Sequence, residues 1–313
     1  MSGDYHPEKI RGEGPELPER RVMEHALIQS APYQLADLTL TSSDLRIGCS
    51  GWSYKDWSGP FYPKDAAAGD YLKLYARVFD AVEIDSTFYR TPSSVQVNNW
   101  RSVTGDNFRF TAKLPKKITH ELKLRDAVTQ LERFYASMSQ LRDKLGPLLI
   151  QLPPSFNTKK DGEAFEKFLE QLETSKYQHA VEFRNKSWFK TETYKQLESH
   201  NVTLAWSENQ YANTPTETTT DTMYLRLVGD REITQFDGIQ RETEQVMKKW
   251  YDALDEKRGL FRQGYVFFNN HFAGFGPGSV NEFRRLAGLA RLDWKAISAE
   301  PGPLQASMSQ FQK

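Results

Sequence analysis

The sequence has few of the features that give a protein a covalent framework, a net charge or a membrane segment. Its single cysteine, Cys49, has no partner for an intramolecular disulfide. The 41 basic and 41 acidic side chains cancel, so no overall field attracts nucleic acid or an anionic membrane. The opening MSGDYHPEKIRGEGPELPERR lacks the apolar run of a signal peptide, and no window approaches the about 18 consecutive apolar residues of a membrane span. We therefore expect a cytoplasmic protein with no membrane partner, in which any anion site is local.

The composition supports a large folded body. Hydrophobic residues make up 38% of the chain and aromatic residues 13%, which is enough to bury a sizeable core. Residues 1–44 are polar and interrupted by proline, which predicts a leader that orders only partly. The folded body is expected over residues 45–291, followed by a C-terminal tail over residues 292–313.

Short β-type runs alternate with longer segments in which apolar residues recur at intervals of three and four. Eight such runs over about 250 residues predict an α/β fold of the (β/α)8 type, a TIM-type barrel. A doubly wound sheet is the alternative, but the turn after the first run is no G-x-G-x-x-G. Helix starts are predicted at Thr91, an N-cap before Pro92, and at Ser279, which forms a capping box with Glu282. The predicted strands are residues 45–50, 81–85, 108–113, 147–152, 179–184, 202–206, 223–228 and 264–270.

Several linked segments between Arg46 and Asn270 resemble the DUF72 family, also called the YecE-like family. They are GCSGWSYKDWSGPFYP, AVEIDSTFYRTPS, NFRFTAKLPKKITH, LLIQLPPSF, AVEFRNKSWF, YLRLVGDR and VFFNN, in the family's order. The resemblance implies a TIM-type barrel and no settled reaction. Two positions depart from the family pattern: Asp85 stands where asparagine is usual, and Glu208 is the candidate to replace an acidic residue at the end of the sixth strand.

Polar side chains recur at the carboxyl ends of the predicted strands. Because a strand alternates with a period of two, Glu83 and Asp85 share one face while Val82 and Ile84 share the other. In a barrel, the inward face at the strand ends forms the active site. The structural interpretation is an ion-pair network that plugs the barrel mouth, because a buried charge must be paired. Groups that converge from so many strands favour a functional pocket instead.

The leading hypothesis is an enzyme that acts on a small anionic molecule, phosphorylated or carboxylated and sugar-like, by acid/base chemistry. Both hydrolysis and isomerisation are open. Guanidinium and ammonium groups suit an anion, and carboxylates and histidine suit proton transfer. The predicted catalytic residues are Glu83, Glu182 and His120, and the predicted substrate-binding residues are Lys113, Arg184, Arg226, Asp85, Gln151, Asn269, Trp52 and Tyr89.

Two loops add candidates. The glycine-rich loop after the eighth strand supplies Gly276, Gly278 and Ser279 as a candidate phosphate loop, since barrels often bind phosphate at a helix start there. The aromatic residues of the loop at 51–63 are expected mostly to pack it against the barrel, although stacking on a sugar or base is open. Cys49 is expected to be a small buried residue rather than a nucleophile.

No metal or other cofactor is expected, although loosely bound magnesium or manganese is left open. Glu83, Asp85, Glu182, His120 and His271 offer oxygen and nitrogen ligands, but basic residues offset the acids and no H-E-x-x-H spacing occurs.

Two other functions are kept as alternatives. One is a metal-dependent phosphodiesterase or other enzyme that processes nucleic acid, which the balanced charge disfavours. The other is a non-catalytic protein that binds a metabolite or serves as a scaffold. Fold alone does not choose among these functions, and the oligomeric state is not predicted.

Overall fold

The structure, a computed structural model, describes residues 44–299. Nearly all of the predicted leader, and the end of the predicted tail, lie outside these residues. The beginning of the tail forms a helix, α9 (Trp294–Ala299), which packs on α1 (Tyr71–Val78). The Trp294 indole donates a hydrogen bond to the carbonyl of Pro60 at 2.8 Å.

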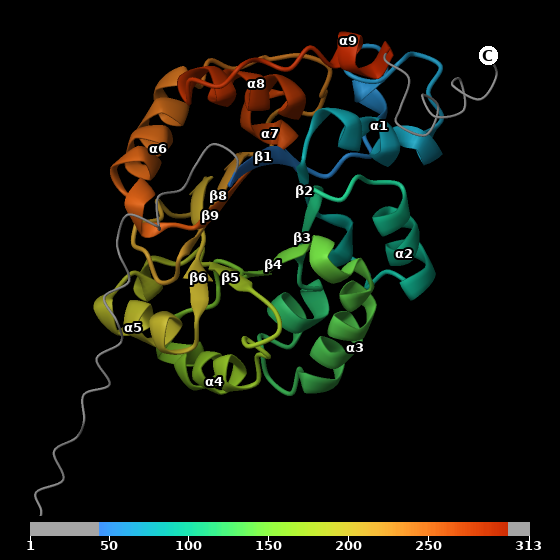
Figure 1. The fold of residues 1–313 in the computed structure, drawn as a ribbon. Helices are drawn as coiled ribbons and strands as arrows, with labels where there is room; N and C mark the ends of the chain where they lie inside the picture. The colour runs from blue at the N-terminus through green and yellow to red at the C-terminus, as the bar shows by residue number, and fades with distance from the viewer. Residues whose placement is uncertain (1–43, 300–313) are drawn as a thin grey trace, which may run out of the picture. The chain divides into compact units, whose positions relative to one another are not determined.

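The strands are all parallel and run around a ring (Figure 1) in the order β6-β5-β4-β3-β2-β1-β9-β8-β7. β6 pairs with β5, β7 pairs with β8, and only Ala205 separates β6 from β7, so one chain segment closes the ring. All eight predicted strands are confirmed, the sixth being divided at Ala205. The strands are β1 (Leu45–Ser50), β2 (Ala81–Ile84), β3 (Arg109–Lys113), β4 (Leu145–Gln151), β5 (His179–Glu182), β6 (Val202–Leu204), β7 (Trp206–Asn209), β8 (Thr222–Gly229) and β9 (Gln263–Phe268).

Helices surround the ring of strands (Figure 1), which confirms the predicted (β/α)8 barrel. The longer helices bury apolar side chains on one side. In α1, for example, Tyr71, Leu72, Tyr75 and Val78 are buried, a spacing of three and four. The other helices are α2 (Ser94–Ser102), α3 (Val128–Met138), α4 (Thr158–Glu170), α5 (Thr191–Ser199), α6 (Glu244–Glu256), α7 (Asn270–Ala273) and α8 (Gly276–Leu286).

Both predicted helix starts are wrong. Helix α2 begins two residues after Pro92, and its cap is Ser93, whose hydroxyl accepts a hydrogen bond from the backbone N–H of Gln96 at 3.2 Å. Ser279 lies inside the first turn of α8, where its hydroxyl donates to the carbonyl of Phe275. Helix α8 starts earlier, at Gly276, and has Pro277 in its first turn. Proline suits that position because it has no N–H to leave unpaired and its φ is already helical.

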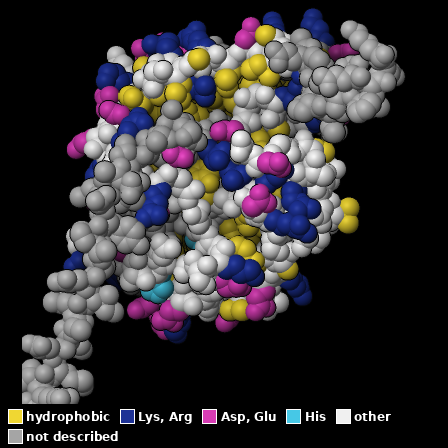
Figure 2. Space-filling view, viewed as in Figure 1, with side chains coloured by type: hydrophobic (Ala, Val, Ile, Leu, Met, Phe, Trp, Pro, Cys, Tyr) yellow, Lys and Arg dark blue, Asp and Glu magenta, His cyan; other side chains and the backbone are white. Residues whose placement is uncertain are grey.

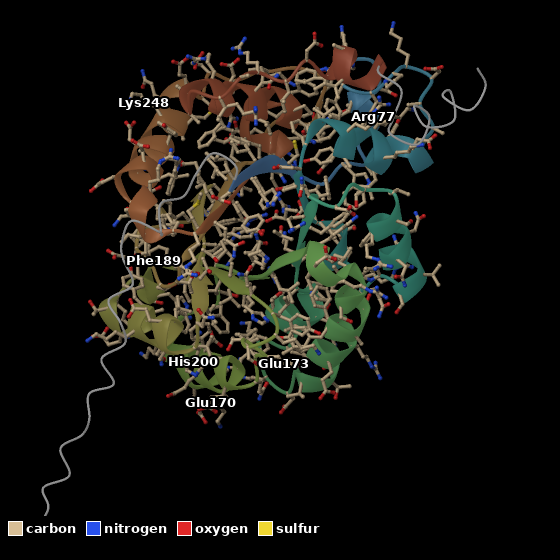
Figure 3. All side chains as sticks on the ribbon, in the orientation of Figure 1. Arg77, Glu170, Glu173, Phe189, His200 and Lys248 are labelled. Atoms are coloured by element: carbon tan, nitrogen blue, oxygen red, sulfur yellow. The ribbon has the colours of Figure 1, made fainter. Side chains whose placement is uncertain are left out.

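The core has two layers. The larger lies between strands and helices, and the smaller fills the barrel interior with Ala81, Leu149, Ala180, Ala205, Tyr224, Tyr265 and Phe267. Stick side chains fill the space inside the ring of strands (Figure 3). On the face seen in Figure 2, acidic and basic side chains are interspersed, as the balanced composition suggests. Between residues 44 and 299, no helix is long and apolar enough to cross a membrane.

Candidate active site

Polar residues replace apolar ones in the interior layer nearest the carboxyl ends of the strands. The strand register aligns Ser50 with Glu83 and Gln151 with Glu182, and it aligns Ser207 with Arg226. Four of these six side chains, those of the glutamates, the glutamine and the arginine, were predicted site residues, and they continue the inward columns that hold Ala81, Leu149, Ala180 and Tyr224. The alternation in each strand therefore delivers one polar group to the same layer.

Arg226 lies at the centre of this layer and joins the two glutamates. Its Nε donates to Oε2 of Glu83 at 2.8 Å, and its Nη2 donates to Oε1 at 2.7 Å. Its Nη1 donates to Oε2 of Glu182. All three side chains are at most 1% exposed. We call Glu83, Arg226 and Glu182 the buried triad.

Further donors complete the hydrogen bonding of the two carboxylates. Glu83 also accepts from the hydroxyls of Ser50 at 2.9 Å and Tyr224 at 2.7 Å. Glu182 also accepts from Gln151 Nε2 at 3.1 Å and Arg184 Nε at 2.6 Å. Every carboxylate oxygen of the buried triad is therefore bonded to protein donors, as a buried charge requires.

The opposite charges of the buried triad keep one another ionised. Burial by itself raises the pKa of Glu182, but the guanidinium groups of Arg226 and Arg184 outweigh it and hold that pKa well below its ordinary value. Burial lowers the pKa of Arg226, and the two glutamates raise it well above its ordinary value. Both groups stay charged at neutral pH, and Glu182 cannot act as an acid there.

A second set of groups lies closer to solvent. Lys113, the last residue of β3, has its Nζ 3.4 Å from Oδ1 of Asp85 and 4.7 Å from the centre of the Phe88 ring. Asn269 donates to the other oxygen of Asp85 at 3.5 Å. The side chain of Asp85 keeps 24% exposure, unlike the carboxylates of the buried triad, while its Oδ1 is buried and accepts no hydrogen bond among the described residues.

Arg184 connects the buried triad to the mouth. Its Nε donates to Glu182, and its guanidinium carbon lies 5.0 Å from the centre of the Tyr211 ring, with which it makes a cation–π contact. Among the described residues, Nη1 and Nη2 of Arg184 make no hydrogen bond. The guanidinium group of Arg184 is thus held through Nε, and Nη1 and Nη2 are available to donate hydrogen bonds to a ligand.

His120 lies within electrostatic range of Arg184 and Lys113. Burial, with these two cations adding to it, lowers the pKa of His120 to about 4, so the imidazole is neutral at physiological pH. The residue belongs to a π-helical turn, Lys117–Glu121, which is followed by left-handed backbone at Lys123, Leu124 and Asp126. Such turns and such strained backbone are frequent at functional sites.

Other predicted site residues lie elsewhere. Trp52 packs edge-on against Trp100 of α2, with ring centres 5.5 Å apart. Tyr89 is the exposed neighbour of Phe88, at 73% exposure. Trp57, Phe61 and Tyr62 are buried, which confirms that the aromatic loop mostly packs against the barrel.

The candidate phosphate loop lies in the layer between strands and helices. A Cβ on Gly276 would come within 3.4 Å of Cys49, Asn270 and Trp57, and Ser279 is fully buried. The N–H of Gly276 already donates to Asn270. A Cβ on Gly278 would meet the side chains of Phe275 and Ile239. None of the three candidate residues therefore contacts the groups at the mouth. Cys49 is fully buried, and burial raises the pKa of its thiol, as expected for a structural cysteine.

Glu208 faces away from the interior, because its neighbour Ser207 occupies the inward position. Its carboxylate accepts a hydrogen bond from the Trp250 indole of α6 at 2.7 Å, so it does not join the acids of the mouth. Within residues 44–299, no three His, Cys, Asp or Glu side chains converge as a metal site. Magnesium or manganese binding stays a prediction.

Sequence reasoning missed Phe88, Tyr211 and Ser50. Phe88 adjoins the predicted Tyr89, which was its only local signal. Ser50 follows Cys49, which was expected to be structural and gave no such signal. Tyr211 lies in an irregular segment beyond β7, where no periodicity indicates which side chain reaches Arg184.

Comparisons with known proteins agree with this architecture. A family model described as "Protein of unknown function DUF72" matches residues 46–304. The UPF0759 protein YunF of Bacillus subtilis is 25% identical over 261 residues, which cover 73% of this chain and 89% of that protein. The UPF0759 protein YecE of Escherichia coli K12 is 32% identical over 143 residues, 46% of this chain and 49% of that protein. The crystal structure of a DUF72 family protein from Thermotoga maritima matches with a TM-score of 0.68 and 30% identity, covering 78% of this chain and 99% of that one.

Proposed function

The chain belongs to the DUF72 family, and from the geometry of its barrel mouth we propose that it is an enzyme acting on a small anionic, sugar-like molecule by acid/base chemistry. One observation carries the proposal. Arg184 donates from Nε to Glu182 and lies against the Tyr211 ring, while its two outer nitrogens make no hydrogen bond among the described residues. A guanidinium fork in this state matches a phosphate or carboxylate group.

The groups beside Arg184 suit proton transfer to such a ligand. Asp85 is a partly exposed carboxylate, and His120 is neutral and next to two cations. A carboxylate and a neutral imidazole are common general bases and acids. Lys113 adds a second cationic group on the same side of the site. Asp85 and His120 are therefore the proposed catalytic residues, and Arg184 the main anion-binding residue.

The buried triad has a different role in this proposal. Because both oxygens of Glu83 and of Glu182 are bonded to protein donors, these groups act as positioning residues. Glu182 holds the side chain of Arg184 in position, and the bonds of Arg226 to the two glutamates connect the carboxyl ends of β2, β5 and β8. A rigid support of this kind is what a functional site needs to keep its contacting groups in place.

The test is the melting temperature of the full-length protein with sugar phosphates, carboxylates, nucleotides and short oligonucleotides, each with and without EDTA. A ligand at 100 times its Kd stabilises by about 2.7 kcal/mol, which is roughly 5 to 10 °C for a domain of this size. We expect small anionic ligands to give this shift in the parent and in Arg133→Gln, an exposed control on α3, but not in Arg184→Gln. A shift that Arg184→Gln retains would refute the proposed site. Stabilisation by oligonucleotides alone would favour the nucleic-acid alternative.

A further inference from the structure

Among the residues that the structure describes, two lysines, Lys113 and Lys144, have buried side chains, and their ammonium groups differ in hydrogen bonding. Lys144, 6% exposed, donates from Nζ to the carbonyls of Arg101 at 2.9 Å and Thr104 at 2.7 Å, and to the Thr104 hydroxyl at 3.4 Å. An ammonium group has three hydrogens to donate, so this one is satisfied. Lys144 is therefore a structural lysine.

Lys113 has no comparable set of acceptors. Its side chain is 11% exposed, and its Nζ makes an ion pair with Asp85 at 3.4 Å and a cation–π contact with Phe88. In the part of the chain that the structure describes, no hydrogen bond is made by this Nζ. An unsatisfied buried ammonium is unfavourable, and at Lys113 one ion pair and one ring contact take the place of the hydrogen bonds that Lys144 makes.

The position of Lys113 in the barrel is one at which a reactive amine could meet a substrate. It ends β3 at the mouth of the barrel, where the partly exposed Asp85 and the neutral His120 lie beside it. Reactive groups of this fold class sit at these strand ends. A neutral lysine amine there is a nucleophile toward carbonyl carbon.

We propose that Lys113 forms an imine with the aldehyde or ketone carbon of an anionic substrate whose charged group binds Arg184. The inference rests on the proposed function and narrows its substrate class to anionic carbonyl compounds. The buried triad and Lys144 take no part in the bond-making step.

The step balances without any further reactant. The lone pair of Nζ forms the C–N bond, and the carbonyl oxygen takes up a proton to become a hydroxyl. The C–O bond then breaks, and the oxygen takes a second proton and leaves as water. An ammonium group and a carbonyl compound thus give a protonated imine and one water. Asp85, 3.4 Å from Nζ, is placed to take a proton from the ammonium and return it to the departing oxygen.

The electrostatics agree with this geometry. Burial lowers the pKa of Lys113 and Arg226 adds to that effect, while Asp85, Glu83 and Glu182 oppose it, and the net shift is downward. Each unit of lowering raises the fraction of neutral amine near neutral pH about tenfold.

The test is reductive trapping on the full-length protein. The protein is incubated separately with pyruvate, dihydroxyacetone phosphate and pyridoxal phosphate, then treated with sodium borohydride, which converts an imine to a stable secondary amine. We expect one mass increment that peptide mapping assigns to Lys113. Lys113→Met and Lys113→Arg should abolish it. The matched control is Lys117→Met, at an exposed lysine in the π-helical turn that follows β3, and this variant should retain the increment.

The outcomes separate this inference from the proposed function. Adducts spread over exposed lysines, or unchanged in Lys113→Arg, overturn the imine. If the three compounds stabilise the protein through Arg184 but leave no adduct, the imine is refuted and the anion site stands. If an adduct forms on Lys113 equally in Arg184→Gln, the imine stands and the anion site fails. If these compounds give neither stabilisation nor an adduct, both the imine and the anion site are refuted.

Discussion

Arg226 and Glu83 lie 143 residues apart in the sequence and form a two-pronged ion pair inside the barrel, with N–O distances of 2.7 and 2.8 Å. The pair joins β8 to β2, which are not neighbours in the sheet. Breaking a fully buried pair by removing one partner leaves an uncompensated charge.

Glu83→Gln is therefore expected to lower the free energy of unfolding by about 3 to 5 kcal/mol, because Arg226 loses its two-pronged partner. Urea denaturation measures this loss. Glu163→Gln removes a glutamate of an exposed ion pair on α4 and should change the unfolding midpoint very little. Equal midpoints for Glu83→Gln and the parent would show that the triad contributes nothing to stability.

Arg184→Lys keeps a positive charge but removes the planar fork. We expect the variant to bind inorganic phosphate and dihydroxyacetone phosphate about tenfold more weakly, since an ammonium group cannot make two parallel hydrogen bonds. Isothermal titration calorimetry measures the two Kd values. Arg133→Lys on α3 is the control and should bind as the parent does. Unchanged affinity in Arg184→Lys would mean that charge alone, and not the fork, holds the anion.

His179 should make folding pH-dependent. It is buried at the start of β5, its Nε2 lies 2.7 Å from the Tyr135 hydroxyl, and burial lowers its pKa from 6.5 to about 4. Between these values the unfolded chain takes up a proton that the folded chain does not. The contribution of neutral His179 to the free energy of unfolding is thus complete above pH 6.5. It is lost as the pH is lowered through this window, by about 3 kcal/mol in all.

His179→Gln should flatten the pH profile of unfolding in that window. His200→Gln is the control, changed at a histidine at the outer edge of the barrel beyond α5 (Figure 3), and it should keep the parent slope. If His179→Gln also retains the slope, the pH dependence arises from other groups.

Ser93, and not Thr91, should carry the capping energy of α2. Ser93→Ala removes the acceptor for the Gln96 N–H and is expected to lower the free energy of unfolding by about 1 kcal/mol. Thr91→Ala should have a much smaller effect, because Thr91 lies outside the helix. Chemical denaturation of both variants compares them directly, and a larger loss in Thr91→Ala would contradict the observed cap.

The sequence by itself determined the strands and which of their side chains point inward. Both follow from local order: strand-forming runs recur between helical segments, and side chains alternate with a period of two. Glu83, Lys113, Gln151, Glu182 and Arg226 could therefore be placed in the barrel interior. The same local reasoning failed for the helix starts predicted at Thr91 and Ser279, because several nearby residues can cap one helix and only the backbone path selects among them.

Only the tertiary structure decided which inward side chains are fully hydrogen-bonded to other protein groups and which remain available to a ligand. Ring closure through Ala205 brings β8 beside the rest of the barrel, so that Arg226 saturates two glutamates that are remote in sequence. Helix packing buries Gly276 against β1, and an irregular segment brings Tyr211 onto Arg184. These outcomes depend on contacts between distant segments, which the periodicity of any one segment cannot encode.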